Sequence, residues 1–160
     1  MKKYFSIVFI LLISSVYAGE LYNDFGYGKV VFTGQDLTIE VEVAKTAEQR
    51  SRGLMYRDSL GQEKGMLFVF DHALIQRVWM INTLISLDIV FISTQGKIVS
   101  IIKSLQPCVK KPCEIYNSTE KAKYMLEINA GMIDNKGIAV GQMLKIEERV
   151  RRSTSLDISE

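Results

Sequence analysis

The clearest chemical signal in the sequence is a set of polar side chains placed among apolar strand residues. The apolar decapeptide 79–88 contains an amide, a hydroxyl and a carboxylate, and Glu127 stands between Leu126 and Ile128. A buried polar group without a partner costs about 1 to 3 kcal/mol, so we expect these groups to have partners or to face a cavity. The candidate ligand-binding residues are Arg52, Arg57, Trp79, Asn82, Thr83, Asp88 and Glu127.

This set supports three interpretations. The arginines could hold a ligand carboxylate through two hydrogen bonds, which gives a pocket for a small polar ligand. Asp88 and Glu127 could instead be the base and acid of a hydrolase acting on an envelope sugar, which needs two carboxyl groups roughly 5 to 9.5 Å apart and one raised pKa. In the third, the arginines brace the acids within the fold. No recognisable nucleophile or metal triad accompanies the set, so we favour a non-catalytic binding module without a cofactor.

Other reactive residue types are sparse. His72 is the only histidine, which excludes zinc or copper sites that need two imidazoles, and we expect it on the surface. The seven methionines are scattered among apolar residues, so core packing explains them better than copper(I) binding. The sequence has no Gly-x-Ser-x-Gly elbow and no phosphate-binding glycine loop.

Cys108 and Cys113 are the only cysteines, and they stand in a loop beside Pro107 and Pro112. In an oxidising compartment two nearby cysteines usually close a disulfide, which here would stiffen the connection 103–117. A metal or redox role and unpaired thiols are the alternatives. Redox pairs usually stand two residues apart, and a metal site would need further ligands, so we predict the disulfide.

Apolar periodicity predicts the elements that must position these residues. Residues 37–43 alternate apolar and polar types, as in a strand with one buried face. Thr46 and Gln49 form a capping-box pattern that predicts a short helix at about 47–52. Further strands are expected at 66–70, 77–80, 87–92, 97–102, 124–128 and 143–147, with a hairpin loop at 93–96.

Short strands separated by turn signals, without long helices between them, indicate a mainly β fold. We predict a single domain built as a jelly-roll-like sandwich or barrel of short antiparallel strands, with one or two short helices. The polar segment 71–76 is expected to separate two strands. The predicted organisation is a signal peptide at 1–18, a lead-in segment at 19–32, the β-domain at 33–148 and a disordered tail at 149–160.

The first 18 residues predict export. Lys2 and Lys3 precede an apolar run at 4–13, and small residues follow, with Val16 and Ala18 placed for cleavage before Gly19. The run is shorter than the roughly 20 residues that a spanning helix needs, so an uncleaved anchor is the less favoured alternative. We therefore predict a periplasmic or secreted protein.

Removal of this leader changes the charge balance. The full chain carries 20 basic and 18 acidic residues, and loss of the two lysines leaves 18 of each. A neutral chain gives no general electrostatic reason to bind nucleic acid or an anionic membrane. After the leader, no segment is apolar for long enough to insert stably in a bilayer. The expected partner is a small polar ligand or an envelope protein.

Six ordered motifs resemble the family called domain of unknown function 192 (DUF192). They extend the match from about residue 33 to residue 147, nearly the whole predicted domain. The resemblance implies a mainly β domain of jelly-roll-like or barrel-like build, often exported, whose activity is not established. The motifs are RGLMYR (52–57), GMLFVF (65–70), WMINTL (79–84), LDIVFI (87–92), LE with AG (126–131) and GIAVG (137–141).

The chain also departs from this family pattern. Ile81 stands where the family commonly has lysine, Ser86 where it commonly has proline, and Gln142 where aspartate often occurs. The missing lysine matters most, since it would supply a charge for an anionic ligand. Any site shared with the family is expected among the matching residues, which are Arg57, Asn82, Thr83, Asp88 and Glu127.

Overall fold

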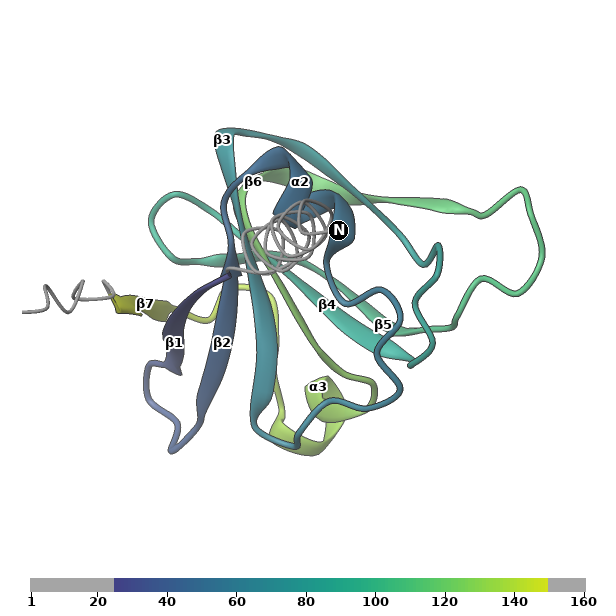
Figure 1. The fold of residues 1–160 in the computed structure, drawn as a ribbon. Coiled ribbons are helices and arrows are strands. Elements are labelled where there is room, and N and C mark those ends of the chain that lie inside the picture. The colour runs from purple at the N-terminus through teal and green to yellow at the C-terminus, as the bar shows by residue number, and fades with distance from the viewer. Residues whose placement is uncertain (1–24, 150–160) are drawn as a thin grey trace, which may run out of the picture.

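The apolar runs of the sequence form the strands of one sheet. A computed structural model describes residues 25–149, and this part of the chain contains seven strands and two short helices. Figure 1 shows their arrangement, with α2 and α3 at opposite ends of the sheet. The elements are β1 (Gly26–Phe32), β2 (Thr38–Ala44), α2 (Ala47–Arg52), β3 (Lys64–Trp79), β4 (Leu87–Ile92), β5 (Ile98–Leu105), β6 (Ile115–Asn129), α3 (Met132–Lys136) and β7 (Leu144–Arg149).

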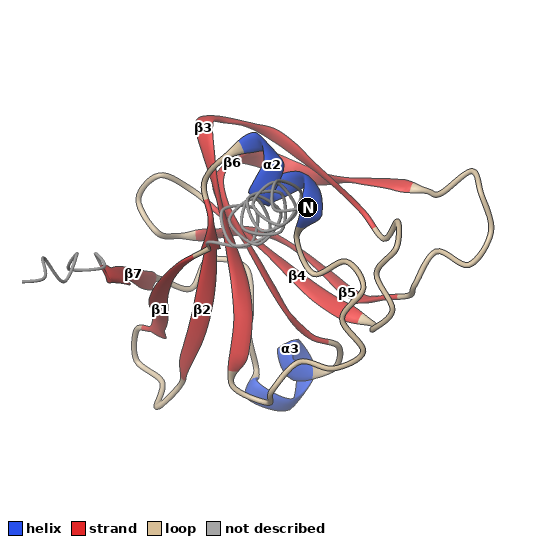
Figure 2. Cartoon of the chain, viewed as in Figure 1, coloured by secondary structure: helices blue, strands red, loops and turns tan. Residues whose placement is uncertain are grey.

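The sheet confirms the predicted mainly β class (Figure 2). Its strands lie in the order β5-β4-β6-β3-β2-β1-β7, and it is not closed into a barrel. The neighbouring strands run antiparallel, as expected, except β2 and β3, which are parallel. The helix α2 and the loop after it form the crossover between these two strands.

The sheet edges meet at one point. Lys97, just before β5, forms an isolated bridge with Met143, just before β7. The Leu144 amide donates a 2.7 Å hydrogen bond to the Gly96 carbonyl. A Cβ atom on residue 96 would lie 2.4 Å from the Leu144 carbonyl oxygen, so this contact requires glycine.

Two strands are much longer than the sequence suggested. β3 has 16 residues and β6 has 15, and their outer halves form a two-stranded ribbon that extends beyond the rest of the sheet (Figure 1). The predicted break at 71–76 is wrong, because pairing with β6 carries the strand through it with two register shifts. Gln76 is buried there, and its side-chain amide donates to the Ala122 carbonyl at 3.0 Å. His72 is exposed, as expected.

The sheet buries apolar side chains on both faces. One cluster, which we call the α3-side core, includes Leu67, Val90, Leu126 and Ile128 and is covered by α3. The other, the α2-side core, includes Met66, Phe68, Ile89, Phe91 and Met125. Neighbouring residues along β3, β4 and β6 alternate between the two, because successive strand side chains point to opposite faces. Where the pairing is regular, the position of a residue in these strands therefore assigns its side chain to a face.

Two local features show where sequence signals succeeded and failed. The predicted helix is confirmed as α2, and both hydrogen bonds of the Thr46–Gln49 capping box are present. The predicted lead-in segment, by contrast, includes β1, which pairs with β2 on one side and β7 on the other. The predicted signal peptide and cleavage site, and the tail from residue 150 onward, lie outside the described residues.

Within residues 25–149, no helix is long and apolar enough to cross a membrane.

Candidate functional site

A pocket of about 380 Å³ opens between α2 and the paired strands β3 and β6. We call it the α2 pocket. Its lining includes three arginines, one glutamate, one serine, one threonine and several apolar residues. The lining includes Arg50, Ser51, Arg52, Met55, Phe68, Phe70, Arg77, Trp79, Thr83, Ile115, Met125 and Glu127.

Glu127 supplies the carboxyl group. It lies in β6, opposite Met66 of β3 and Ile89 of β4, so it projects into the α2-side core. Its residue is only 6% exposed, and no described residue donates a hydrogen bond to its side chain or pairs with it. Burial raises the pKa of the Glu127 carboxyl to about 8, and no neighbouring charge offsets this shift. The group is therefore mainly protonated at neutral pH.

The three arginines differ in how they are held. Arg50 donates to the Val69 carbonyl at 3.0 Å, lies 3.4 Å from a carboxylate oxygen of Asp71, and stacks its guanidinium over the Phe70 ring. Arg52 lies in the last turn of α2. Arg77 is exposed and forms no ion pair with any described residue. Arg77 is thus the guanidinium with the greatest freedom to bind a ligand.

Aromatic and aliphatic groups form the rest of the lining. Phe68 and Met125 come from the α2-side core. Trp79 and Ile115 face each other in the β3–β6 register at the outer end, and they are 45% and 47% exposed. Partly exposed apolar groups beside guanidinium groups suit a ligand that carries both an apolar part and a negative charge.

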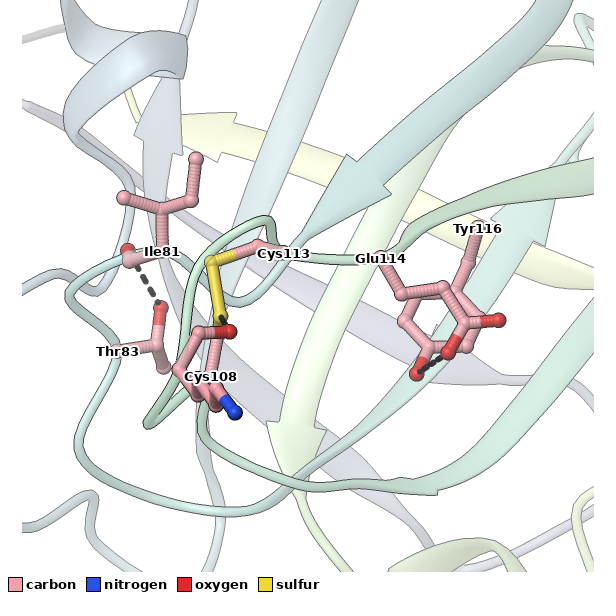
Figure 3. Close-up of a disulfide and its surroundings, with 7 residues drawn as sticks. Ile81, Thr83, Cys108, Cys113, Glu114 and Tyr116 are labelled. Carbon is pink, nitrogen blue, oxygen red and sulfur yellow. Dashed lines mark hydrogen bonds between the residues drawn. A yellow bond between two sulfur atoms is a disulfide. The ribbon is translucent and has the colours of Figure 1, made fainter.

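The turn after β3 brings Thr83 to the pocket. Its hydroxyl donates to the Ile81 carbonyl at 3.4 Å, and the Cys108 amide donates to the Met80 carbonyl at 3.2 Å. Figure 3 shows this turn beside the Cys108–Cys113 disulfide. The predicted disulfide is thereby confirmed, and its loop is tied to the turn that carries Thr83.

The structure places Asp88 away from this pocket. In β4, Asp88 stands opposite Ile128 rather than Glu127, so its side chain points to the other face of the sheet. It is fully buried, and its two oxygens accept hydrogen bonds from the Ser104 and Ile133 amides, each at 2.8 Å. Asp88 and Glu127 therefore do not face one cleft, and the geometry of a hydrolase with this carboxyl pair is not formed.

Arg57 also has a structural partner. It forms two hydrogen bonds with Glu42, at 2.5 and 2.8 Å, and these bonds raise the pKa of the Arg57 guanidinium. The pair lies in a second groove of about 390 Å³ along β1 and β2, separate from the α2 pocket. Arg57 is thus a brace between the loop after α2 and β2.

Asn82 is exposed at a turn. Its backbone is left-handed, with φ at 54°, and its carbonyl accepts a 2.8 Å hydrogen bond from the Tyr56 amide. Its side-chain amide lies 3.9 Å from the Met55 sulfur. Asn82 joins the two segments beside the pocket, but its side chain is not part of the lining.

Of the seven predicted residues, the structure brings four together in the α2 pocket: Arg52, Trp79, Thr83 and Glu127. Sequence reasoning missed Arg50 and Arg77. Arg50 had a usable signal, because it lies two residues before Arg52 in the predicted helix. Arg77 had no usable signal, because the register shifts in β3 change the face to which a side chain points and cannot be predicted from the alternation of residue types.

The lining contains no histidine and only one acidic residue. Among the described residues, no group of three or more His, Cys, Asp or Glu side chains is placed to hold a metal ion.

Comparison with known proteins places the chain in a family. The model of DUF192, described as "Uncharacterized ACR", matches residues 29–146. The chain belongs to the DUF192 family. This confirms the resemblance seen in its motifs and extends it to include most of β1. No curated protein is significantly similar to this DUF192 chain.

Solved structures with the same fold include two bacterial proteins. One, from Sinorhizobium meliloti, is described as a candidate transcription regulator. It is 33% identical, with a TM-score of 0.71 over 76% of this chain and 95% of that chain. The other, from Novosphingobium aromaticivorans, is a protein of unknown function. It is 28% identical, with a TM-score of 0.67 over 74% of this chain and 83% of that chain.

Proposed function

We propose that this DUF192 chain is an exported, non-catalytic binding domain that holds a small organic anion in the α2 pocket. The observation that carries the proposal is that three arginines line one pocket together with aromatic residues. Guanidinium groups match the planar geometry of a carboxylate and stay charged at any physiological pH.

Arg77 and the apolar lining support a ligand with two chemical parts. Arg77 has no competing ion pair among the described residues, so a ligand anion would be its partner. Phe68, Phe70 and Trp79 offer apolar surface for the remainder of the ligand. A volume of about 380 Å³ is at the lower end of the range for small-molecule sites, roughly 300 to 1,000 Å³.

Binding without turnover is favoured by the kinds of groups around the pocket. Glu127 is the one acid in the lining, and the second acid of the sequence-based hydrolase hypothesis lies on the opposite face. Ser51 and Thr83 have no histidine beside them to act as a general base.

Export is supported by the leader pattern at 1–18 and by the Cys108–Cys113 disulfide. Disulfides persist in oxidising compartments and are rare in the cytosol. Mass spectrometry of the protein from the cell envelope should find a chain that begins at Gly19 and lacks two thiol hydrogens. A chain that keeps Met1, or free thiols, would contradict export with cleavage.

The ligand proposal is tested by thermal shift on the protein that begins at Gly19. The panel contains aromatic and aliphatic carboxylates, organic phosphates, and the neutral amides of the same carboxylates. A ligand at 100 times its dissociation constant adds about 2.7 kcal/mol of stability, so carboxylates should raise the melting temperature and their amides should not.

Arg77→Ala should lose this response while keeping the melting temperature of the free protein, because Arg77 is exposed. Lys121→Ala is the matched control, since Lys121 is an exposed cation on the facing strand of the same ribbon but outside the pocket. Equal shifts with carboxylates and amides, or no shift with any compound, would contradict an anion site.

A further inference from the structure

We infer that Glu127 is the hydrogen-bond donor at the floor of the α2 pocket, so that the pocket selects a carboxylate ligand and releases it when Glu127 ionises. This inference rests on the proposed function and adds a role for a residue that an arginine-based site does not require. It makes Glu127 a specificity-determining residue, acting through a proton that it shares with the ligand.

Because of its position in the sheet, the Glu127 carboxyl can find a hydrogen-bond partner only in the pocket. β6 is hydrogen-bonded to β3 on one side and β4 on the other, so the Glu127 backbone is fixed in the middle of the sheet. Its opposite residues in those strands, Met66 and Ile89, are apolar and buried. Buried polar groups normally have hydrogen-bond partners, and no described residue supplies one to Glu127. A ligand oxygen in the pocket would do so.

Apart from Glu127, the charged residues that line the pocket are all arginines. α2 contributes Arg50 and Arg52, and β3 contributes Arg77. Ile89, the neighbour of Glu127 in β4, is apolar and lies outside the lining. No histidine and no second acid lines the pocket. The α2 pocket therefore offers arginine residues and one carboxyl group to a bound carboxylate, and no arginine lowers the pKa of that carboxyl.

The protonation state of that carboxyl decides whether the contact attracts or repels. A neutral carboxyl donates its O–H to a carboxylate oxygen, which makes a short charge-assisted hydrogen bond. The raised pKa of Glu127, about 8, keeps this proton in place at neutral pH. Above that pH the two carboxylates repel each other in a partly desolvated site, and the ligand is released.

Arginines alone would give a different pH dependence. Guanidinium groups stay protonated beyond pH 12, and simple carboxylates ionise near pH 4, so affinity for an arginine-only site would be flat from pH 6 to 9. If only the protonated form of Glu127 binds, apparent affinity follows its population. It should then fall about tenfold between pH 7 and pH 9.

The experiment is an NMR titration with benzoate, and with benzamide as its neutral counterpart, at pH 6, 7, 8 and 9. Glu127→Gln keeps a permanent N–H donor in place of the carboxyl. This variant should bind benzoate at pH 7 within a few-fold of the wild type and lose the pH dependence. Glu120→Gln is the matched control, because Glu120 is an exposed glutamate on the same strand. It should keep the wild-type pH profile.

The outcomes separate the two proposals. A flat benzoate profile in the wild type, or the same falling profile in Glu127→Gln, overturns the role of Glu127 and leaves an Arg77-dependent anion site intact. Absence of benzoate binding at every pH, in the wild type and both variants, contradicts the proposed function itself. The wild-type profile decides the question even if Glu127→Gln does not fold.

Discussion

Two buried carboxyl groups lie on opposite faces of this sheet, and they differ in their hydrogen bonds. Asp88 is fully buried in β4, and each of its oxygens accepts a backbone N–H, one from Ser104 and one from Ile133. Glu127 lies on the neighbouring strand, where no described donor reaches it and the α2 pocket lies in front of it. A buried acid whose bonds are made within the chain serves the fold. One whose bonds are left unmade is available to a ligand.

The Asp88 side should show the largest effect on stability. Asp88→Ala leaves the Ser104 and Ile133 amides without acceptors and opens a small cavity on the α3 side. Hydrogen bonds to charged groups are worth about 1.5 to 3 kcal/mol each, so the expected loss is roughly 3 to 6 kcal/mol. Urea unfolding measures it. A cost of less than 1 kcal/mol for Asp88→Ala would contradict the structural role of Asp88.

Glu127 should make the free energy of unfolding depend on pH. Because the pKa of Glu127 is about 8 when folded and about 4.5 when unfolded, the folded state holds a proton that the unfolded state has lost between those values. Its contribution is complete below pH 4.5 and disappears as pH rises to about 8. The wild type should lose roughly 3 to 5 kcal/mol over this range. Glu127→Gln should not.

The measurement is the difference between the unfolding free energies of the wild type and Glu127→Gln at pH 5 and pH 9. Subtracting the variant removes the contributions of other acids, such as Glu40 and Glu147, whose pKa values are lowered by lysine neighbours. Parallel curves for the two proteins would mean that Glu127 titrates normally, and the contrast with Asp88 would then be lost.

Loss of the disulfide should reduce amide-hydrogen protection more in the turn beside the α2 pocket than around Asp88. Replacing Cys108 and Cys113 by serine removes a small covalent ring, for which the expected loss is about 2 kcal/mol. Because the Cys108 amide binds the Met80 carbonyl, the turn that carries Thr83 should also exchange its amide hydrogens faster. The Ile133 amide, held by Asp88, should keep its protection. Equal loss of protection at both places would contradict this assignment.

The smallest effect is expected at Arg57. Its pair with Glu42 is about one-third exposed, so Arg57→Ala should cost about 1 kcal/mol. It should leave the carboxylate-induced thermal shift unchanged, since Arg57 lies outside the α2 pocket. A double-mutant cycle with Glu42→Gln isolates the pair. Loss of the ligand response in Arg57→Ala would move the binding site to the second groove.

Elements whose sequence pattern lies within the element itself were predictable from sequence. The capping box defined α2, and the alternation at 37–43 defined β2. The short helix α3 had no such signal. Its first turn has no side-chain cap of its own, and the Ile133 amide is held by Asp88, which is 45 residues away in the sequence. Contacts of this length are set by the folded chain and not by neighbouring residues.

Two strand segments were missed for similar reasons. β1 begins with Gly26 and Gly28, which are poor strand formers, and it is held in place by pairing on both sides. The ribbon segment 71–76 is mostly exposed, and its apolar residues are consecutive, so it lacks the alternation that marks a half-buried strand.

The sequence indicated which residue types could form the site. It did not indicate the face of the sheet to which each side chain points. The argument from polar groups in apolar runs selected Thr83 and Glu127, and both line the α2 pocket. The same argument also selected Asp88, because the sequence does not show that Asp88 is opposite Ile128 in the register. A shift of one residue in that register would have put both acids on one face. Strand register therefore decides that Asp88 stabilises the fold while Glu127 faces the pocket.

The pairing of β1 with β7 has a consequence for how the chain is made. β7 pairs with β1 along its whole length, from Phe32 opposite Leu144 to Tyr27 opposite Arg149. A chain that emerges from its amino end therefore carries its first strand with one side unpaired until the last strand of the domain has appeared. Until then the open N–H and C=O groups of β1 are a template for another chain. Premature termination before residue 144 would make that exposure permanent, and such fragments should associate edge to edge.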